Sequence, residues 1–109
     1  MKAPMTLLPG TLDILVLKAA SWQTQHGYGL ARSIEERSND ELKIEEGALY
    51  QALHRLERQG YLTATWGVSD NNRRAKFYAL TQMGRRRLRE DSARWHRYAD
   101  AMGRVLAPA

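Results

Sequence analysis

The sequence contains no cysteine among its 109 residues. A chain without cysteine has no disulfide framework, no thiolate nucleophile and no zinc-thiolate site. Small proteins of oxidising compartments are commonly held together by disulfides, so this absence favours a reducing compartment. We therefore expect a cytoplasmic protein.

Long hydrophobic runs are also missing. Near the N-terminus Lys2 precedes an apolar stretch, but Pro9, Gly10, Asp13 and Lys18 interrupt it. A signal peptide needs an unbroken apolar segment, and a membrane-spanning helix needs about 20 apolar residues. The sequence predicts neither of these, and so it predicts no membrane partner.

A recognisable catalytic or metal-binding arrangement is absent as well. The 3 histidines, His26, His54 and His96, fall in separate predicted elements, without a serine or carboxylate at a recognised catalytic spacing. No glycine-rich phosphate loop follows a strand, and no two histidines pair at i and i+4 on one helix face. We therefore predict a protein that is not an enzyme and that holds no cofactor and no metal.

Positive charge is what the sequence has in excess. Its 17 lysines and arginines against 12 aspartates and glutamates give a net charge of +5. This balance favours an anionic partner, although basic charge can also serve solubility alone. The length fits one domain, and a hydrophobic content of 43% is enough for a modest core.

Hydrophobic periodicity predicts three helices, a β-hairpin and a long final helix. Thr11 and Thr81 stand where N-caps of the first and last helices belong, and Gly60 stands where a glycine ends the third. This order predicts a mainly α fold with a small β-hairpin, which is a winged helix-turn-helix followed by a long C-terminal dimerisation helix. We expect a DNA-binding unit at residues 1–81 and a dimerisation helix at residues 82–109, joined in one compact unit. The predicted segments are helices at about residues 11–22, 28–38, 46–59 and 82–106, strands at 61–68 and 75–80, and turns at 23–27 and 69–72.

The third predicted helix carries donors and acceptors opposite its apolar face. A DNA major groove admits one α-helix, and there glutamine pairs with adenine, and arginine with guanine, through two hydrogen bonds each. Gln51 has this chemistry, and either Arg55 or Arg58 would take a guanine or hold a phosphate. Tyr50 would either donate its hydroxyl to a phosphate or pack its ring against the hairpin, and His54 is either a reader or ordinary polar surface. The predicted DNA contacts of this helix are Ala48, Tyr50, Gln51, His54, Arg55 and Arg58.

The predicted hairpin turn is basic and rich in hydrogen-bonding groups. Arginine is favoured in a narrow minor groove because the negative potential is enhanced there. The alternative is that Asp-Asn-Asn is only a good turn sequence and that the arginines are solvated. The predicted DNA contacts of this wing are Asn71, Asn72, Arg73 and Arg74 at the tip, with Lys76 following onto phosphate.

The final predicted helix is too long and too one-sided to belong only to a small core. Leu88, Trp95 and Met102 recur every seven residues, and a stripe of this kind needs a partner helix. We therefore predict a homodimer. Trp22 and Trp66 are expected in core or hairpin packing. The predicted dimer interface consists of Leu88, Trp95, Tyr98, Ala99, Met102, Val105 and Leu106.

Four stretches of the sequence carry a family resemblance. They are GTLDILVLKAASW (residues 10–22), HGYGLARSIEE (26–36), EEGALYQALHRLERQGYL (45–62) and NNRRAKFYALTQMG (71–84). Together they closely resemble the PadR family of bacterial transcriptional regulators, over nearly the whole chain. A single helix follows the hairpin, as in the short branch of that family.

The resemblance implies a repressor that binds double-stranded DNA at a two-fold operator. It also implies that flat aromatic compounds bind between the subunits against Trp95, whereas the residue alone is better explained as an interface anchor. Ala48 and Gln51 depart from the serine and proline that are common in the family, so base preference does not transfer from a relative. The alternative function is a ligand-sensing or protein-interaction helical module that binds a planar aromatic compound at the dimer interface and uses its basic charge for solubility.

Overall fold

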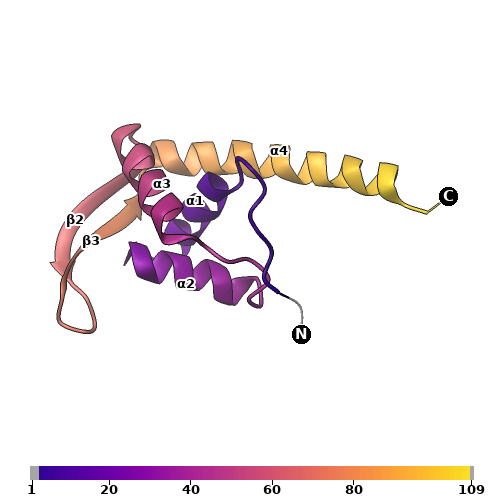
Figure 1. Ribbon diagram of the computed structural model, residues 1–109. Helices are drawn as coiled ribbons and strands as arrows, with labels where there is room; N and C mark the ends of the chain where they lie inside the picture. The colour runs from indigo at the N-terminus through magenta and orange to yellow at the C-terminus, as the bar shows by residue number, and fades with distance from the viewer. Residues whose placement is uncertain (1–2, 109) are drawn as a thin grey trace.

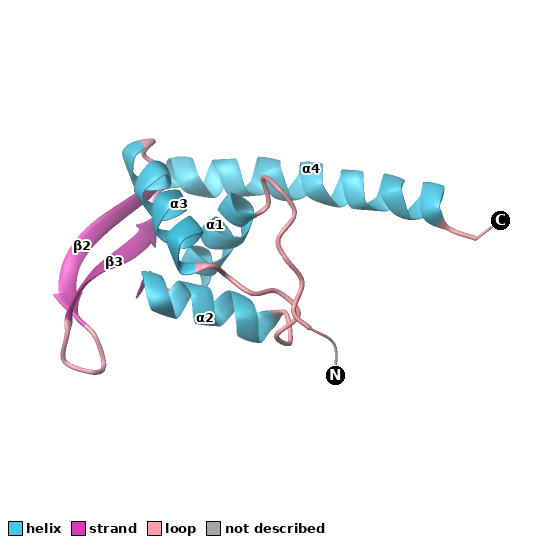
Figure 2. Cartoon of the chain, in the orientation of Figure 1, coloured by secondary structure: helices cyan, strands magenta, loops and turns pink. Residues whose placement is uncertain are grey.

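The helices and strands of the computed structural model follow the predicted order, with one strand added (Figures 1 and 2). The structure describes residues 3–108. Lys2 and residue 109, which ends the predicted dimerisation unit, therefore lie outside it. Its mainly helical architecture with a small antiparallel sheet confirms the predicted winged helix. The elements are α1 (Leu12–Trp22), β1 (Gln25–His26), α2 (Gly27–Arg37), α3 (Glu46–Arg58), β2 (Leu62–Val68), β3 (Arg74–Leu80) and α4 (Gln82–Leu106).

α1 is the central element of the core. It contacts α2, α3, α4 and β3, and its Val16 and Leu17 are completely buried. Such a position requires a helix that is apolar nearly all round, as the sequence of α1 is. α2 and α3 each contact α1 and contribute one apolar face to the core. The buried apolar side chains of these two helices are Leu30, Ala31, Ile34, Leu49, Ala52, Leu53 and Leu56.

The sheet has three strands in the order β1-β3-β2. β2 and β3 form the predicted hairpin, with Leu62 opposite Leu80 and Val68 opposite Arg74, so the return strand begins one residue before the predicted start. The prediction of a polar turn at residues 23–27 was wrong in part, because Gln25 pairs with Tyr78 and His26 with Phe77. A strand of two residues is too short to produce a periodic pattern.

The helix ends were predicted with mixed success. Thr81 caps α4, because its Oγ1 accepts a hydrogen bond from the Gly84 amide at 3.0 Å. Thr11 does not cap α1: its hydroxyl donates to the Leu8 carbonyl at 2.7 Å, since the turn through Gly10, with φ of 84°, brings that carbonyl close. Gly60 ends α3 as predicted, with φ of 87°, in the left-handed region that glycine enters most easily.

Trp22 and Trp66 were expected in core or hairpin packing, and neither lies in the core. Trp22 is 39% exposed and Trp66 is 59% exposed. Each indole is covered by an arginine, Arg37 at 4.5 Å from the Trp22 ring and Arg74 at 4.7 Å from the Trp66 ring. Cation–π contacts of this kind allow an indole to remain at the surface. Trp66 therefore packs within the hairpin and not in the core.

α4 begins against the core and then extends beyond it, so its last turns project from the rest of the protein (Figure 1). Leu88 is buried, but further along the same stripe Tyr98 is 59% exposed and Met102 is 42% exposed. The protomer thus leaves most of the apolar stripe uncovered. Within residues 3–108, no helix is both long and apolar enough to span a membrane.

Candidate nucleic-acid interface

The outer face of α3 presents a row of polar side chains. Gln51, His54 and Arg58 are exposed and follow one another at helical spacing. Within residues 3–108, no side-chain hydrogen bond or ion pair engages any of the three. Ala48 is exposed beside them. This row, Gln51, His54 and Arg58, is called the reading stripe below.

Each flank of α3 is tied to another element by an ion pair. Arg55 Nη2 pairs with Asp13 Oδ1 in the first turn of α1, and Lys76 Nζ of β3 lies 3.4 Å from Glu57 Oε1. Both pairs are partly exposed, so each contributes at most about 1 kcal/mol to stability. They link α3 to α1 on one flank and to β3 on the other. Arg55 and Lys76, both predicted to contact DNA, therefore already have partners within the protein.

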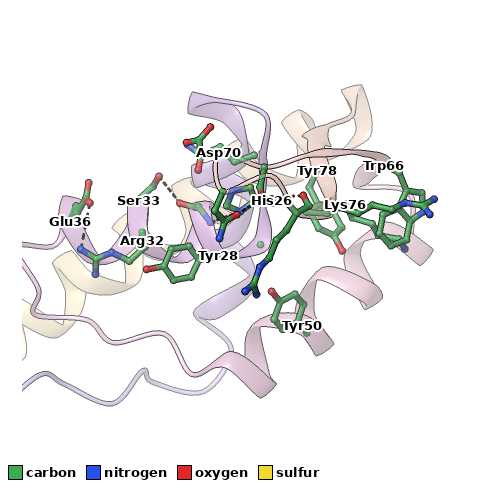
Figure 3. A pocket seen from close by; sticks show the side chains of 18 residues that line it. His26, Tyr28, Arg32, Ser33, Glu36, Tyr50, Trp66, Asp70, Lys76 and Tyr78 are labelled. Atoms are coloured by element: carbon green, nitrogen blue, oxygen red, sulfur yellow. Dashed lines mark hydrogen bonds and ion pairs between the residues drawn. The ribbon is translucent and has the colours of Figure 1, made fainter.

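Tyr50 lies between the reading stripe and the wing. Its side chain is exposed, and its ring lies beside Gly27, where an added Cβ would approach the ring to 3.0 Å. The ring packs against the start of α2, and the two predicted roles, a phosphate contact and packing against the hairpin, stay predictions. The Tyr50 side chain lines the cleft described below and points toward it (Figure 3).

The wing tip is exposed at each of its predicted contacts. The turn is closed by the Ser69 amide, which donates to the Arg73 carbonyl at 2.8 Å, and Asn72 adopts a φ of 61°. Asparagine tolerates this left-handed conformation better than most residues. The Arg74 guanidinium stacks on Trp66. The Arg73 guanidinium, in contrast, pairs with no side chain among the described residues. Arg73 is therefore the cation at the tip that is free to take an external anion.

A cleft of about 850 Å³ separates the wing from the start of α2 (Figure 3). Its walls combine aromatic rings with cations, which is suitable chemistry for a sugar-phosphate chain. We call it the wing cleft. Its residues used below are His26, Tyr28, Arg32, Tyr50, Trp66 and Arg73.

Four of these cleft residues, namely His26, Tyr28, Arg32 and Trp66, were not among the predicted contacts. His26 caps α2, because its Nδ1 accepts a hydrogen bond from the Gly29 amide at 3.0 Å. In a neutral imidazole this places the proton on Nε2, which makes that atom a donor. Tyr28 is exposed and Arg32 is partly exposed on α2. A polar residue directly before a helix was the available signal for His26, but histidine is an uncommon N-cap.

Glu35 connects α2 to the segment that leads into α3. Its Oε2 accepts a hydrogen bond from the Ile44 amide at 3.0 Å, and its Oε1 pairs with Arg32 at 2.7 Å. The Ile44 bond, followed by the Arg32 interaction, holds the pKa of Glu35 below its usual value of 4.5. This charged form therefore stabilises the position in which α3 begins.

Glu35→Gln is expected to make unfolding less sensitive to acid. Because the folded protein lowers the pKa, the carboxylate stabilises the fold above about pH 4.5, and this contribution is lost as the pH falls through the folded pKa. At pH 7 the variant should lose about 1 kcal/mol, and the difference from the original protein should shrink near pH 3. Urea denaturation at both pH values measures it, with Glu36→Gln as the matched control. An equal loss at both pH values would contradict the assignment.

Comparison with known proteins identifies the family. Residues 16–90 match the Transcriptional regulator PadR-like family. The chain is 32% identical over 90 residues to a Lysinibacillus sphaericus protein named "Uncharacterized protein X", with 82% of each chain covered. A PadR family transcriptional regulator from Eggerthella lenta is 35% identical with a TM-score of 0.77, over 92% of this chain and 85% of that one. A PadR family transcription regulator from Clostridium difficile is 27% identical with a TM-score of 0.77, over 90% and 100%. The match runs from α1 through the reading stripe and the wing into α4, and the chain therefore belongs to the PadR-like family of transcriptional regulators.

Proposed function

We propose that this regulator represses transcription by binding a two-fold operator as a homodimer. In each subunit, residues 1–81 contact DNA and residues 82–109 supply the dimerisation helix. The observation that carries the proposal is the unpaired reading stripe on α3, which lies next to a wing whose tip arginine is also unpaired. Together they offer external hydrogen-bond donors on one side of the protein.

The reading stripe is suited to the major groove. Gln51 offers the donor and acceptor that adenine requires, and Arg58 can donate twice to guanine. The ion pair with Asp13 makes Arg55 a poorer candidate for a base than Arg58, because its guanidinium would first have to leave that carboxylate. We therefore assign sequence recognition to Gln51 and Arg58, with His54 between them.

The wing is suited to the adjacent minor groove. If α3 enters one groove and Arg73 the next, the DNA strand that separates the two grooves passes along the wing cleft. Cleft residues on α2, Tyr28 and Arg32, then lie on the opposite side of that strand from the wing. Contacts to phosphate fix the position of a protein on DNA without reading sequence. The cleft therefore positions the reading stripe.

The two-fold arrangement follows from α4. Its apolar stripe is largely exposed in one protomer. Because soluble monomers rarely expose so large an apolar surface, this exposure favours a partner. A second α4 packed against it would cover Trp95, Tyr98 and Met102. The dimer would then present two reading stripes, as a palindromic operator requires.

Selection of bound sequences from a random DNA pool tests the proposal. We expect a palindrome whose half-site spacing corresponds to the dimer, and an affinity that falls steeply with added salt. Transcription from a promoter that carries the selected site should fall when the protein is supplied. Binding that depends on neither sequence nor salt would instead favour the interaction module.

Arg73→Ala is expected to weaken operator binding by about ten-fold without unfolding the protein. The Arg73 side chain is exposed and unpaired among the described residues, so its removal should leave stability within about 0.5 kcal/mol. If Arg73 contacts a DNA phosphate, the slope of log affinity against log salt concentration should become shallower by about one in the variant. A fluorescence anisotropy titration measures both. Arg97→Ala, with the same change of charge on the outer side of α4, is the control, and equal affinity of the two variants would remove the wing from the DNA interface.

The same dimer interface supports a second candidate function, the sensing of a planar aromatic compound. Trp95 is partly exposed, and its ring centroid lies 6.4 Å from that of Tyr98. A flat molecule could stack on this pair where two subunits meet. Titration with a planar dye should quench the Trp95 fluorescence and release the operator. A response that persists unchanged in Trp95→Phe would place the compound elsewhere.

A further inference from the structure

Gly47 occupies a helical position that does not require glycine. It is the second residue of α3, it is exposed, and an added Cβ would meet nothing within 4 Å. Its φ also lies outside the left-handed region, unlike those of Gly10 and Gly60. Glycine is the least favoured residue in a helix apart from proline. Neither the backbone nor the packing of the protomer therefore explains why this position lacks a side chain.

The position of Gly47 on the helix offers an explanation. Gly47 precedes Gln51 by four residues, so it continues the reading stripe toward the start of α3. The adjacent Ala48 is also small and exposed. The first turn of the outward face of α3 is thus nearly bare backbone. Helices that enter the major groove contact base edges mainly with their N-terminal residues.

The neighbouring charges limit what this bare turn can approach. Glu45 and Glu46 directly precede Gly47, and both are exposed. Their carboxylates repel phosphate, but they do not oppose the amino groups on the floor of the major groove. The turn is therefore better suited to base edges than to the DNA backbone.

We propose that Gly47 determines operator specificity by allowing the first turn of α3 to approach the groove floor closely. The missing side chain brings Gln51 within hydrogen-bond reach of the bases, and any larger residue holds the helix away. The proposal rests on the DNA-binding function inferred above. It concerns this residue's effect on base contacts and not on phosphate contacts.

Gly47→Ala and Gly47→Leu test the proposal against the operator selected by the original protein. Thermal melting should show variants at least as stable as the original, because the new Cβ meets only solvent. Anisotropy titrations should show affinity reduced about three-fold for alanine and at least thirty-fold for leucine. Affinity for a random-sequence duplex should be unchanged, since phosphate contacts provide it. Ala93→Leu, at an exposed position on the outer side of α4, is the matched control.

Each other outcome would overturn the inference. Gly47→Leu with full operator affinity would show that the first turn does not approach the bases, and the proposed function would be unaffected. Equal losses on operator and random DNA would assign Gly47 to backbone contact. A lower melting temperature would show that the fold itself needs glycine. If the original protein selects no sequence at all, the proposed function fails first, and this inference fails with it.

Discussion

Gly84→Ala is expected to lower the free energy of unfolding by about 3 kcal/mol, because α4 has no room for a methyl group where it joins the core. Gly84 is buried in the first turn of α4, where an added Cβ would overlap the backbone carbonyl of Tyr61 and lie 2.7 Å from Leu80 Cδ1. A side chain can rotate away from such a contact, but the Tyr61 backbone is held by its own hydrogen bonds to Leu56 and Thr81. α4 itself would therefore have to move.

Thermal or urea denaturation measures this effect, with Gly103→Ala as the control on the same helix. An added Cβ at Gly103 meets nothing within 4 Å in the protomer, so the same substitution there should leave stability unchanged or raise it by up to about 1 kcal/mol. A loss of 3 kcal/mol corresponds to a fall in Tm on the order of 10 °C for a domain of this size. Equal stability of the two variants would show that the contact at Gly84 relaxes freely.

Further contacts fix α4 at the same junction. The Arg87 guanidinium lies 4.8 Å from the centroid of the Tyr61 ring and bonds to Asp91 Oδ2 at 2.8 Å through its Nε. Asp91 is the buried charged residue among residues 3–108, and Arg94 also reaches it at 3.5 Å. Because the Tyr61 amide donates to the Leu56 carbonyl in the last turn of α3, these contacts connect the orientation of α4 to that of α3. In the proposed dimer, this junction therefore helps to set the distance between the two reading stripes.

The main elements of the fold could be predicted from the sequence because each is a long periodic segment with a local end signal. α3 has leucines at helical spacing and Gly60 after them. α4 begins after Thr81, whose hydroxyl oxygen accepts a hydrogen bond from the Gly84 amide in the first turn. Such signals depend on residues that are close along the chain. The predicted bounds of α4 agree with the structure for the same reason.

The contacts that complete the candidate interface could not be predicted, because they join residues distant in sequence. Arg55 and Asp13 are 42 residues apart, and Lys76 and Glu57 are 19 residues apart. Periodicity places each side chain on a face but does not say what lies opposite. The wing cleft likewise depends on β1, whose two residues bring the start of α2 beside the hairpin. The dimer interface and the DNA contacts remain predictions, and the exposed stripe of α4 is where the dimer can be tested most directly.

Met102→Glu is expected to convert the dimer to a monomer and to reduce operator affinity by at least about 100-fold. Met102 lies in the middle of the apolar stripe, where a buried carboxylate without a partner would cost several kcal/mol per subunit. In one protomer the same side chain is 42% exposed, so the substitution should leave the protomer folded. A dimer gains its affinity because the second half-site is bound at a high effective concentration, and a monomer loses that factor of roughly 10² to 10⁴.

Sedimentation velocity and operator titration measure the two effects, and circular dichroism confirms that the helices persist. Ala93→Glu adds the same charge to the same helix on the side opposite the stripe, so it should remain dimeric and bind the operator normally. If Met102→Glu stays dimeric, the subunits associate through another surface, and α4 is not the dimerisation helix. If it is monomeric but binds the operator at full affinity, one protomer is sufficient for recognition. The two-fold operator would then have to be abandoned, while the reading stripe and the wing would still account for the contact of one protomer with DNA.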